Sequence, residues 1–189
     1  MRAEDITALI DYFPTLSKKF GGTINSASIG AFGHSLGGAS SVGVLVQDKR
    51  IKSAVNVDGT FFGPLGTNLT ANDAKRPILL FGSEGHTGEP DTDYTWGAFR
   101  SVQTGWWKQI LVNGSAHHDF SDVAFWKTLP PWKSESIGPI EGKRMLQINR
   151  DVVRDFFDFT LLGKKGTTMD GPSSKYPELD YYLSSNGTA

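Results

Sequence analysis

The sequence predicts an α/β protein in which a mainly parallel sheet is flanked by helices. Two observations carry this prediction. Short apolar segments alternate along the chain with segments of helical periodicity, an order typical of parallel sheets covered on both faces. Each apolar segment ends in glycine or polar residues, as expected where strands end at a site-bearing edge. The 189 residues suit one domain, which we place at residues 1–163, followed by an irregular tail at 164–189.

Residue spacing predicts the positions of the helices and strands along the chain. A first helix is expected over residues 3–20, because apolar side chains recur there at helical spacing and Gly21-Gly22 supplies a permissive backbone for its end. The short apolar runs that predict buried strands lie at residues 27–32, 51–57, 77–81 and 108–112. Further helical patterns run from the first strand to Val46, around residues 96–102, and over residues 143–162.

The composition narrows the classes of function. A net charge of −1 gives no electrostatic reason to expect nucleic acid as a partner. The absence of cysteine excludes disulfides, a cysteine nucleophile and thiolate metal sites, and we expect neither a metal nor a cofactor. N-x-[ST] sequons at Asn68, Asn113 and Asn186 are a weak indication of an extracellular protein.

The segment Gly33-His34-Ser35-Leu36-Gly37 fits the G-x-S-x-G pattern of a nucleophile elbow. Such an elbow turns a strand sharply into a helix, and side chains at the two glycine positions would collide with neighbouring backbone. The turn exposes the serine hydroxyl above the sheet. It also directs the Leu36 N–H, at the start of a helix, toward an oxyanion that develops on a carbonyl substrate. Ser35 is therefore the predicted nucleophile.

A serine hydroxyl needs a base within hydrogen-bond reach. Four histidines are available. His34 lies inside the elbow, where we expect it to pack, and His86 lies in a glycine-rich loop, where we expect it to be solvated. His117 and His118 follow the fourth predicted strand, where the base is expected, and we favour His117.

The base in turn needs a carboxylate that fixes its tautomer and stabilises the imidazolium. Asp58 and Glu84 each follow a predicted strand. Glu84 stands at the position more often used for the acid in enzymes with this elbow. The chain order of nucleophile, acid and base holds for either residue, so spacing alone does not choose between them.

The elbow, the segment Asn56–Phe62, the strand Arg76–Glu84 and the block Gly114–Phe120 together resemble the plasma-type platelet-activating factor acetylhydrolases, which have an α/β-hydrolase fold. The resemblance runs from about residue 24 to the closing helix. It implies Asp58 as the acid and His117 as the base. It also implies metal-free hydrolysis of short acyl esters of small-molecule or lipid type, such as the acetyl ester of an ether phospholipid, with peripheral contact to a lipid interface.

The match departs from the mammalian proteins at Phe61-Phe62 and over residues 85–105, which favours a microbial or fungal relative with another ester substrate. The aromatic residues that we expect to line an acyl or lipid-facing pocket are Phe61, Phe62, Trp96 and Trp126. A cutinase-like or dienelactone-type hydrolase with Glu84 as its acid remains an alternative. A non-catalytic domain that binds a partner or a lipid is a second one.

Ser35 stands close to the start of the chain. Enzymes with this elbow have several strands before it, and the loop that supplies a second oxyanion N–H. We therefore expect the C-terminal portion of a longer protein, with a sheet that lacks its first strands and has an uncovered edge. The lack of one oxyanion donor would cost on the order of 10²–10³ in rate.

Overall fold

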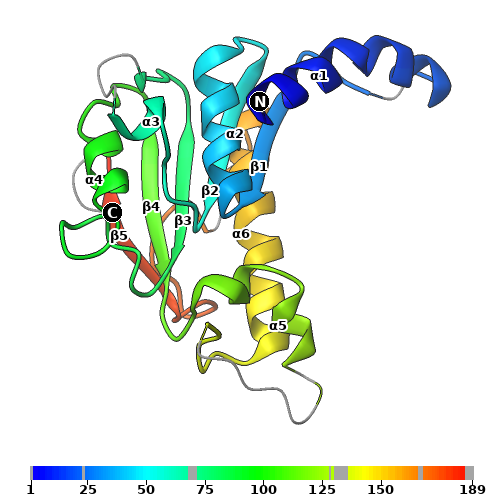
Figure 1. Ribbon diagram of the computed structural model, residues 1–189. Coiled ribbons are helices and arrows are strands. Elements are labelled where there is room, and N and C mark those ends of the chain that lie inside the picture. The colour runs from blue at the N-terminus through cyan, green and yellow to red at the C-terminus, as the bar shows by residue number, and fades with distance from the viewer. Residues whose placement is uncertain are drawn as a thin grey trace.

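The computed structural model describes residues 2–22, 24–67, 72–127, 129, 136–165 and 168–185. Within these residues one sheet has the strand order β1-β2-β3-β4-β5 (Figure 1). The strands are β1 (Ile29–His34), β2 (Ile51–Val57), β3 (Ile78–Ser83), β4 (Trp107–Val112) and β5 (Leu179–Ser184). The first four are parallel, and β5 joins β4 in the antiparallel sense.

Helices cover both faces of this sheet, which confirms the predicted fold class. The described helices are α1 (Arg2–Lys19), α2 (Leu36–Gln47), α3 (Pro64–Thr67), α4 (Tyr94–Arg100), α5 (Val123–Trp126) and α6 (Gly142–Leu162). Figure 1 shows α2 and α6 on opposite sides of the strands. None of the described helices combines the length and the apolar character that a membrane span requires.

The core consists of two layers, one on each face of the sheet. One face packs against α1, α2 and α4 and includes Leu80 of β3. The other packs against α6 and includes Leu79. Consecutive strand residues point to opposite faces, and both Leu79 and Leu80 are almost completely buried. The continuously apolar strand sequences therefore arise because each strand is covered twice.

The tail that we predicted to be irregular contains a strand, so that part of the prediction is wrong. β5 pairs with β4 through partners such as Leu179 and Val112, and Leu179 is 6% exposed. Tyr176 lies in the same apolar layer. Glycine, proline and serine surround this segment and obscured its apolar positions.

The parallel register sets the functional edge of the sheet. His34 is level with Val57, and Ser83 is level with Val112. The carboxyl ends of β1 to β4 therefore lie at one edge, where the sequence had placed the site residues. At the other side of β1, no further strand is paired within the described residues, and Phe32 on β1 is 63% exposed.

Candidate active site

The elbow is tight at Gly33, as predicted, but the collision predicted at Gly37 is wrong, because a Cβ atom there would have no neighbouring atom within 4 Å. The second crowded glycine is Gly38. Ser35 adopts a positive φ of 57° between β1 and α2. A Cβ atom at Gly33 would lie 2.5 Å from the carbonyl carbon of Gly37, and one at Gly38 would lie 2.1 Å from Oδ1 of Asn56. Both contacts are impossible for a side chain, so glycine is required at both positions. The backbone N–H of Ser35 donates to the carbonyl of Val57 at 2.8 Å, which ties the turn to β2.

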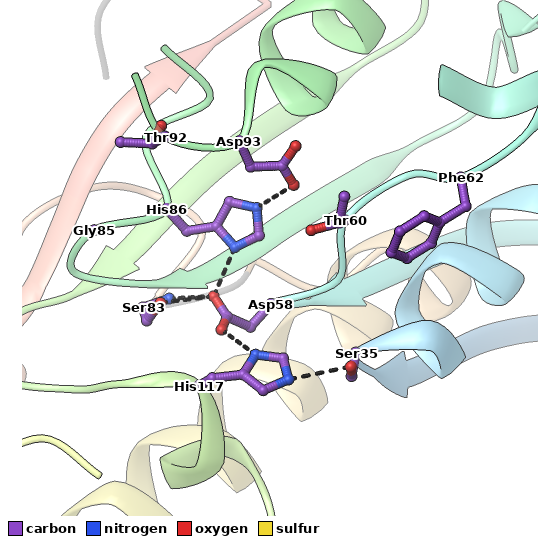
Figure 2. A pocket seen from close by; sticks show the side chains of 10 residues that line it. All are labelled: Ser35, Asp58, Thr60, Phe62, Ser83, Gly85, His86, Thr92, Asp93 and His117. Carbon is purple, nitrogen blue, oxygen red and sulfur yellow. Dashed lines mark hydrogen bonds and ion pairs between the residues drawn. The ribbon is translucent and has the colours of Figure 1, made fainter. Parts of the chain in front are cut away.

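Ser35, His117 and Asp58 form one chain of hydrogen bonds (Figure 2). The Oγ of Ser35 lies 3.1 Å from Nε2 of His117. Nδ1 of the same ring lies 2.7 Å from Oδ2 of Asp58. A carboxylate only accepts, so Nδ1 carries a proton and Nε2 is free to take the proton of the serine. This is the tautomer that a general base requires.

Asp58 is an ionised carboxylate held in a buried position. It is 3% exposed and has a positive φ of 52°. Its Oδ1 accepts from the backbone N–H and the hydroxyl of Ser83 at 2.7 and 2.9 Å, and from Nδ1 of His86 at 2.8 Å. Burial raises the pKa of Asp58. The hydrogen bond and charge of His86 and the Ser83 N–H outweigh it and hold that pKa well below its usual range.

The prediction that His86 is a solvated loop residue is wrong. Its side chain is 9% exposed and bridges two carboxylates, Asp58 through Nδ1 and Asp93 through Nε2 at 2.9 Å (Figure 2). Its ring stacks on Trp96 with centroids 3.8 Å apart. Sequence reasoning missed both His86 and Asp93. The one available signal was Asp93 as the N-cap of α4, where its side chain accepts from the N–H of Thr95.

Two groups hold the backbone around His117, which opens a short 3₁₀ helix, His117–Phe120. Asp119 accepts the backbone N–H groups of Ala116 and Gly138 at 2.8 and 2.7 Å and forms an ion pair with Lys127. Nε2 of His34 donates to the carbonyl of His117 at 2.8 Å, and the two rings lie 4.5 Å apart. Burial, followed by the charge of His117, lowers the pKa of His34. His34 therefore packs, as predicted, and the ring that it packs against is that of His117.

The structure also separates the competing candidates. His118 is exposed, and the ring that reaches Ser35 is that of His117. Glu84 is exposed as well, and its carboxylate accepts the backbone N–H of Gly114 at 2.8 Å. It thereby holds the turn after β4. The geometry brings Asp58 to the imidazole, while Leu36 is the first residue of α2 and its N–H stands at a helix N-terminus next to Ser35.

A pocket of about 510 Å³ opens above this chain of side chains. Its lining residues are Ser35, Asp58, Thr60, Phe62, Ser83, Gly85, His86, Thr92, Asp93 and His117. Figure 2 shows Phe62 across the pocket from His117, on the side of Ser35. Within the described ranges, no three His, Asp or Glu side chains are grouped so that they could hold a metal ion.

Of the four aromatic residues predicted to line the pocket, Phe62 does so and is 61% exposed. The prediction is wrong for the other three. Phe61 is 2% exposed and packs on Phe99, with ring centroids 4.5 Å apart. Trp96 is fully buried, and its indole N–H donates to the carbonyl of Gly59. Trp126 is exposed on α5, outside the pocket wall. Phe61 and Phe62 are neighbours in the loop between β2 and α3, and only the ring of Phe62 faces outward.

Residues 7–130 match the model of a family described as platelet-activating factor acetylhydrolase, isoform II. The chain is 32% identical, over 165 residues, to a protein of Arthroderma benhamiae described as a probable 1-alkyl-2-acetylglycerophosphocholine esterase. That match covers 81% of this chain and 43% of the relative. A platelet-activating factor acetylhydrolase of Cavia porcellus is 28% identical over 104 residues, which are 55% of this chain and 23% of that protein.

Among solved structures, a ferulic acid esterase from Streptomyces cinnamoneus superimposes with a TM-score of 0.80 at 30% sequence identity. The match covers 95% of this chain and 53% of the esterase. The chain thus spans about half the length of the esterase, and less than half of the two relatives above.

Proposed function

Because the chain belongs to the platelet-activating factor acetylhydrolase, isoform II family, we propose that it carries the catalytic residues of a serine carboxylic-ester hydrolase. One observation supports this most strongly. Ser35, His117 and Asp58 come from three distant parts of the chain and are joined by hydrogen bonds of 3.1 and 2.7 Å. All three line the same pocket.

In the proposed reaction, Ser35 Oγ attacks the ester carbonyl while His117 Nε2 takes its proton. The negative charge on the carbonyl oxygen is stabilised by the Leu36 N–H at the start of α2. His117 then gives the proton to the leaving alcohol, and an acyl-serine remains. Water attacks this intermediate with His117 again as base, which releases the carboxylic acid and restores Ser35. Asp58 holds the imidazolium in both half-reactions.

For the substrate we propose short acyl esters, including the acetyl ester of a platelet-activating factor-like phospholipid. The names of the fungal and guinea-pig relatives support this class. The exposed ring of Phe62 at the pocket would contact the acyl chain or the edge of a lipid interface. An extracellular location is proposed on the sequon at Asn113, which is exposed. The sequons at Asn68 and Asn186 lie outside the described residues.

Feruloyl esters are a second candidate substrate class. The structural match to a ferulic acid esterase, which covers 95% of this chain, supports them. Feruloyl esters carry an aromatic acyl group, which Phe62 could stack against. The two candidates share one mechanism and differ only in the acyl group.

The test compares the chain with its Ser35→Ala variant on p-nitrophenyl acetate, butyrate and octanoate, on a 1-alkyl-2-acetyl phospholipid, and on methyl ferulate. We expect Ser35-dependent turnover, with kcat/KM falling about tenfold or more from acetate to octanoate. A preference for methyl ferulate would replace the acetyl ester by the feruloyl ester. Equal rates for the chain and the variant on every ester would reject the hydrolase proposal and favour a binding module.

A further inference from the structure

The hydrogen-bond chain does not end at Asp58 but continues through His86 to Asp93. His86 Nδ1 lies 2.8 Å from Asp58 Oδ1, and Nε2 lies 2.9 Å from Asp93 Oδ2. The ring is 9% exposed and the Asp93 side chain 14%. Figure 2 shows Asp93, His86, Asp58 and His117 one after another along the pocket, with Ser35 beside His117. The proposed hydrolysis uses only three of these five groups.

The partners of His86 determine its protonation state. An ionised carboxylate has no proton to donate, so each ring nitrogen of His86 must donate one, and the ring is an imidazolium. Hydrogen bonds from His86 and Thr95 outweigh burial and lower the pKa of Asp93 to about 2, and Asp58 is ionised as well. Burial lowers the pKa of His86, but the hydrogen bonds to Asp58 and Asp93 raise it above its ordinary value. Trp96, stacked beneath the ring, favours a cation there.

We propose that His86 is a positioning residue for the ester hydrolysis: its imidazolium, held between Asp58 and Asp93, fixes the Asp58 carboxylate toward His117 and sets the charge behind the base. This inference rests on the proposed function. His86 binds Oδ1 of Asp58 together with Ser83, which leaves Oδ2 for His117. Asp58 therefore cannot rotate away from the base without breaking these bonds.

The second part of the proposal is a count of charges. Asp58, protonated His86 and Asp93 together carry one negative charge, the same as a single carboxylate. Without the imidazolium the two carboxylates would place two negative charges behind His117. The base would then keep its proton up to a higher pH. The other ionic groups near His86 are Arg100 of α4, which donates to the carbonyl of Thr87, and its ion-pair partner Glu89. Neither changes in the variants below.

The protonation of His86 can be tested without any turnover. Ring nitrogen shifts from ¹H–¹⁵N NMR of the ¹⁵N-labelled chain at pH 7.5 should show protons on both Nδ1 and Nε2 of His86. In the Asp93→Asn variant an amide replaces one carboxylate and can donate to Nε2, so His86 should lose one proton at the same pH. Asparagine remains a good N-cap for α4. A His86 ring with one unprotonated nitrogen in the wild-type chain would overturn the proposal.

The charge count is tested by pH profiles of kcat/KM for His86→Asn and for the double variant His86→Asn/Asp93→Asn. Asparagine retains a donor near the position of Nδ1. We expect the acid limb of the single variant to move up by roughly 1 pH unit, with about tenfold lower kcat/KM at its plateau. The double variant carries one negative charge again, and its acid limb should return close to that of the wild type.

The matched control is His118→Asn, which removes an exposed histidine next to the base and should leave the profile unchanged. An acid limb that does not move in His86→Asn would overturn the proposal. So would an acid limb that moves equally in the single and the double variant, because a shift caused by a structural defect would not be reversed when Asp93 also loses its charge. If the wild-type chain hydrolyses no ester, the proposed function fails and the positioning role fails with it. The NMR result then still decides whether the Asp58–His86–Asp93 ion group exists.

Discussion

Two buried aspartates hold His117 in place through different partners. Asp58, at the end of β2, is 3% exposed and binds the imidazole rings of His117 and His86. Asp119, in the 3₁₀ helix, is fully buried and binds backbone N–H groups and Lys127. Burial of a carboxylate is therefore not by itself a sign of chemistry. The partner decides: a ring that can exchange a proton indicates catalysis, whereas backbone N–H groups indicate structural support.

The largest effect is expected for Asp58→Asn. The amide would present an N–H to His117 and force the wrong tautomer, so we expect kcat to fall by about 10⁴-fold while the protein stays folded. Steady-state hydrolysis of p-nitrophenyl acetate measures this. The matched control is Glu84→Gln, which alters only the bond to Gly114 and should retain kcat within about twofold. A larger loss in the Glu84 variant than in the Asp58 variant would assign the acid to Glu84.

Asp119→Ala should affect stability more than turnover. The variant leaves Lys127 without its ion-pair partner and two backbone N–H groups without an acceptor. The free energy of unfolding should drop by about 3 kcal/mol, measured by urea denaturation, with Asp122→Ala as the exposed control. Turnover below the unfolding temperature should fall far less than in Asp58→Asn. Unchanged stability together with a 10⁴-fold loss of turnover would make Asp119 a second catalytic carboxylate.

A smaller effect is expected at Asp93, which is joined to Asp58 through His86. Its pKa of about 2 when folded lies below the usual value near 3.9. The depressed pKa contributes stability that is fully present above about pH 4 and is lost as the pH falls through about 2. The difference in unfolding free energy between the wild type and Asp93→Asn should thus be on the order of 1–2 kcal/mol at pH 6 and shrink toward pH 2.5.

Urea denaturation at several pH values measures this difference, with the exposed neighbour Asp91 as control. Asp91→Asn should leave the unfolding free energy unchanged across the range. An unfolding free energy that Asp93→Asn leaves unchanged across the range would mean that Asp93 stabilises the fold only as a cap of α4, a role that asparagine retains, without an ionic bond to His86.

The smallest effect is expected for Phe62→Ala, which removes the exposed ring at the pocket without touching either aspartate. KM should rise about three- to tenfold, and kcat should stay within about twofold, because the ring contacts bound substrate and not the reacting atoms. The control is Phe20→Ala. Phe20 follows the end of α1, its ring has nearly the same exposed fraction, and it does not line the pocket. A fall in kcat with unchanged KM would instead place Phe62 in the catalytic step.

Much of this arrangement could be predicted from the sequence, because strands, elbow and closing helix are encoded in local patterns. The elbow at Ser35 depends on glycines within three residues of it, and β2 has the predicted bounds, Ile51–Val57. The choice between Asp58 and Glu84 could not be made from spacing, because both follow strand ends. It depends on the direction of each side chain, and only the family resemblance indicated it.

Pairing that depends on the path of irregular loops was the part that the sequence did not reveal. The bridge from His86 to Asp93 requires the loop between them to fold back over Trp96, and no periodicity specifies that path. β5 was missed because its partner β4 lies about 70 residues earlier in the chain, and because its short apolar run stands in a tail rich in glycine, proline and serine. The conformation of irregular segments is determined by tertiary contacts, and such contacts position His86 and Asp93.

The proposed mechanism requires a nucleophilic Ser35 that is activated by His117 and Asp58. A fluorophosphonate probe reports this directly, because it phosphonylates an activated serine and the adduct can be located by peptide mass spectrometry. We predict one adduct on Ser35 of the folded chain, none in Ser35→Ala, and strongly slowed labelling in Asp58→Asn. An unlabelled Ser35 in the folded chain, or an adduct on a different serine, would contradict the account.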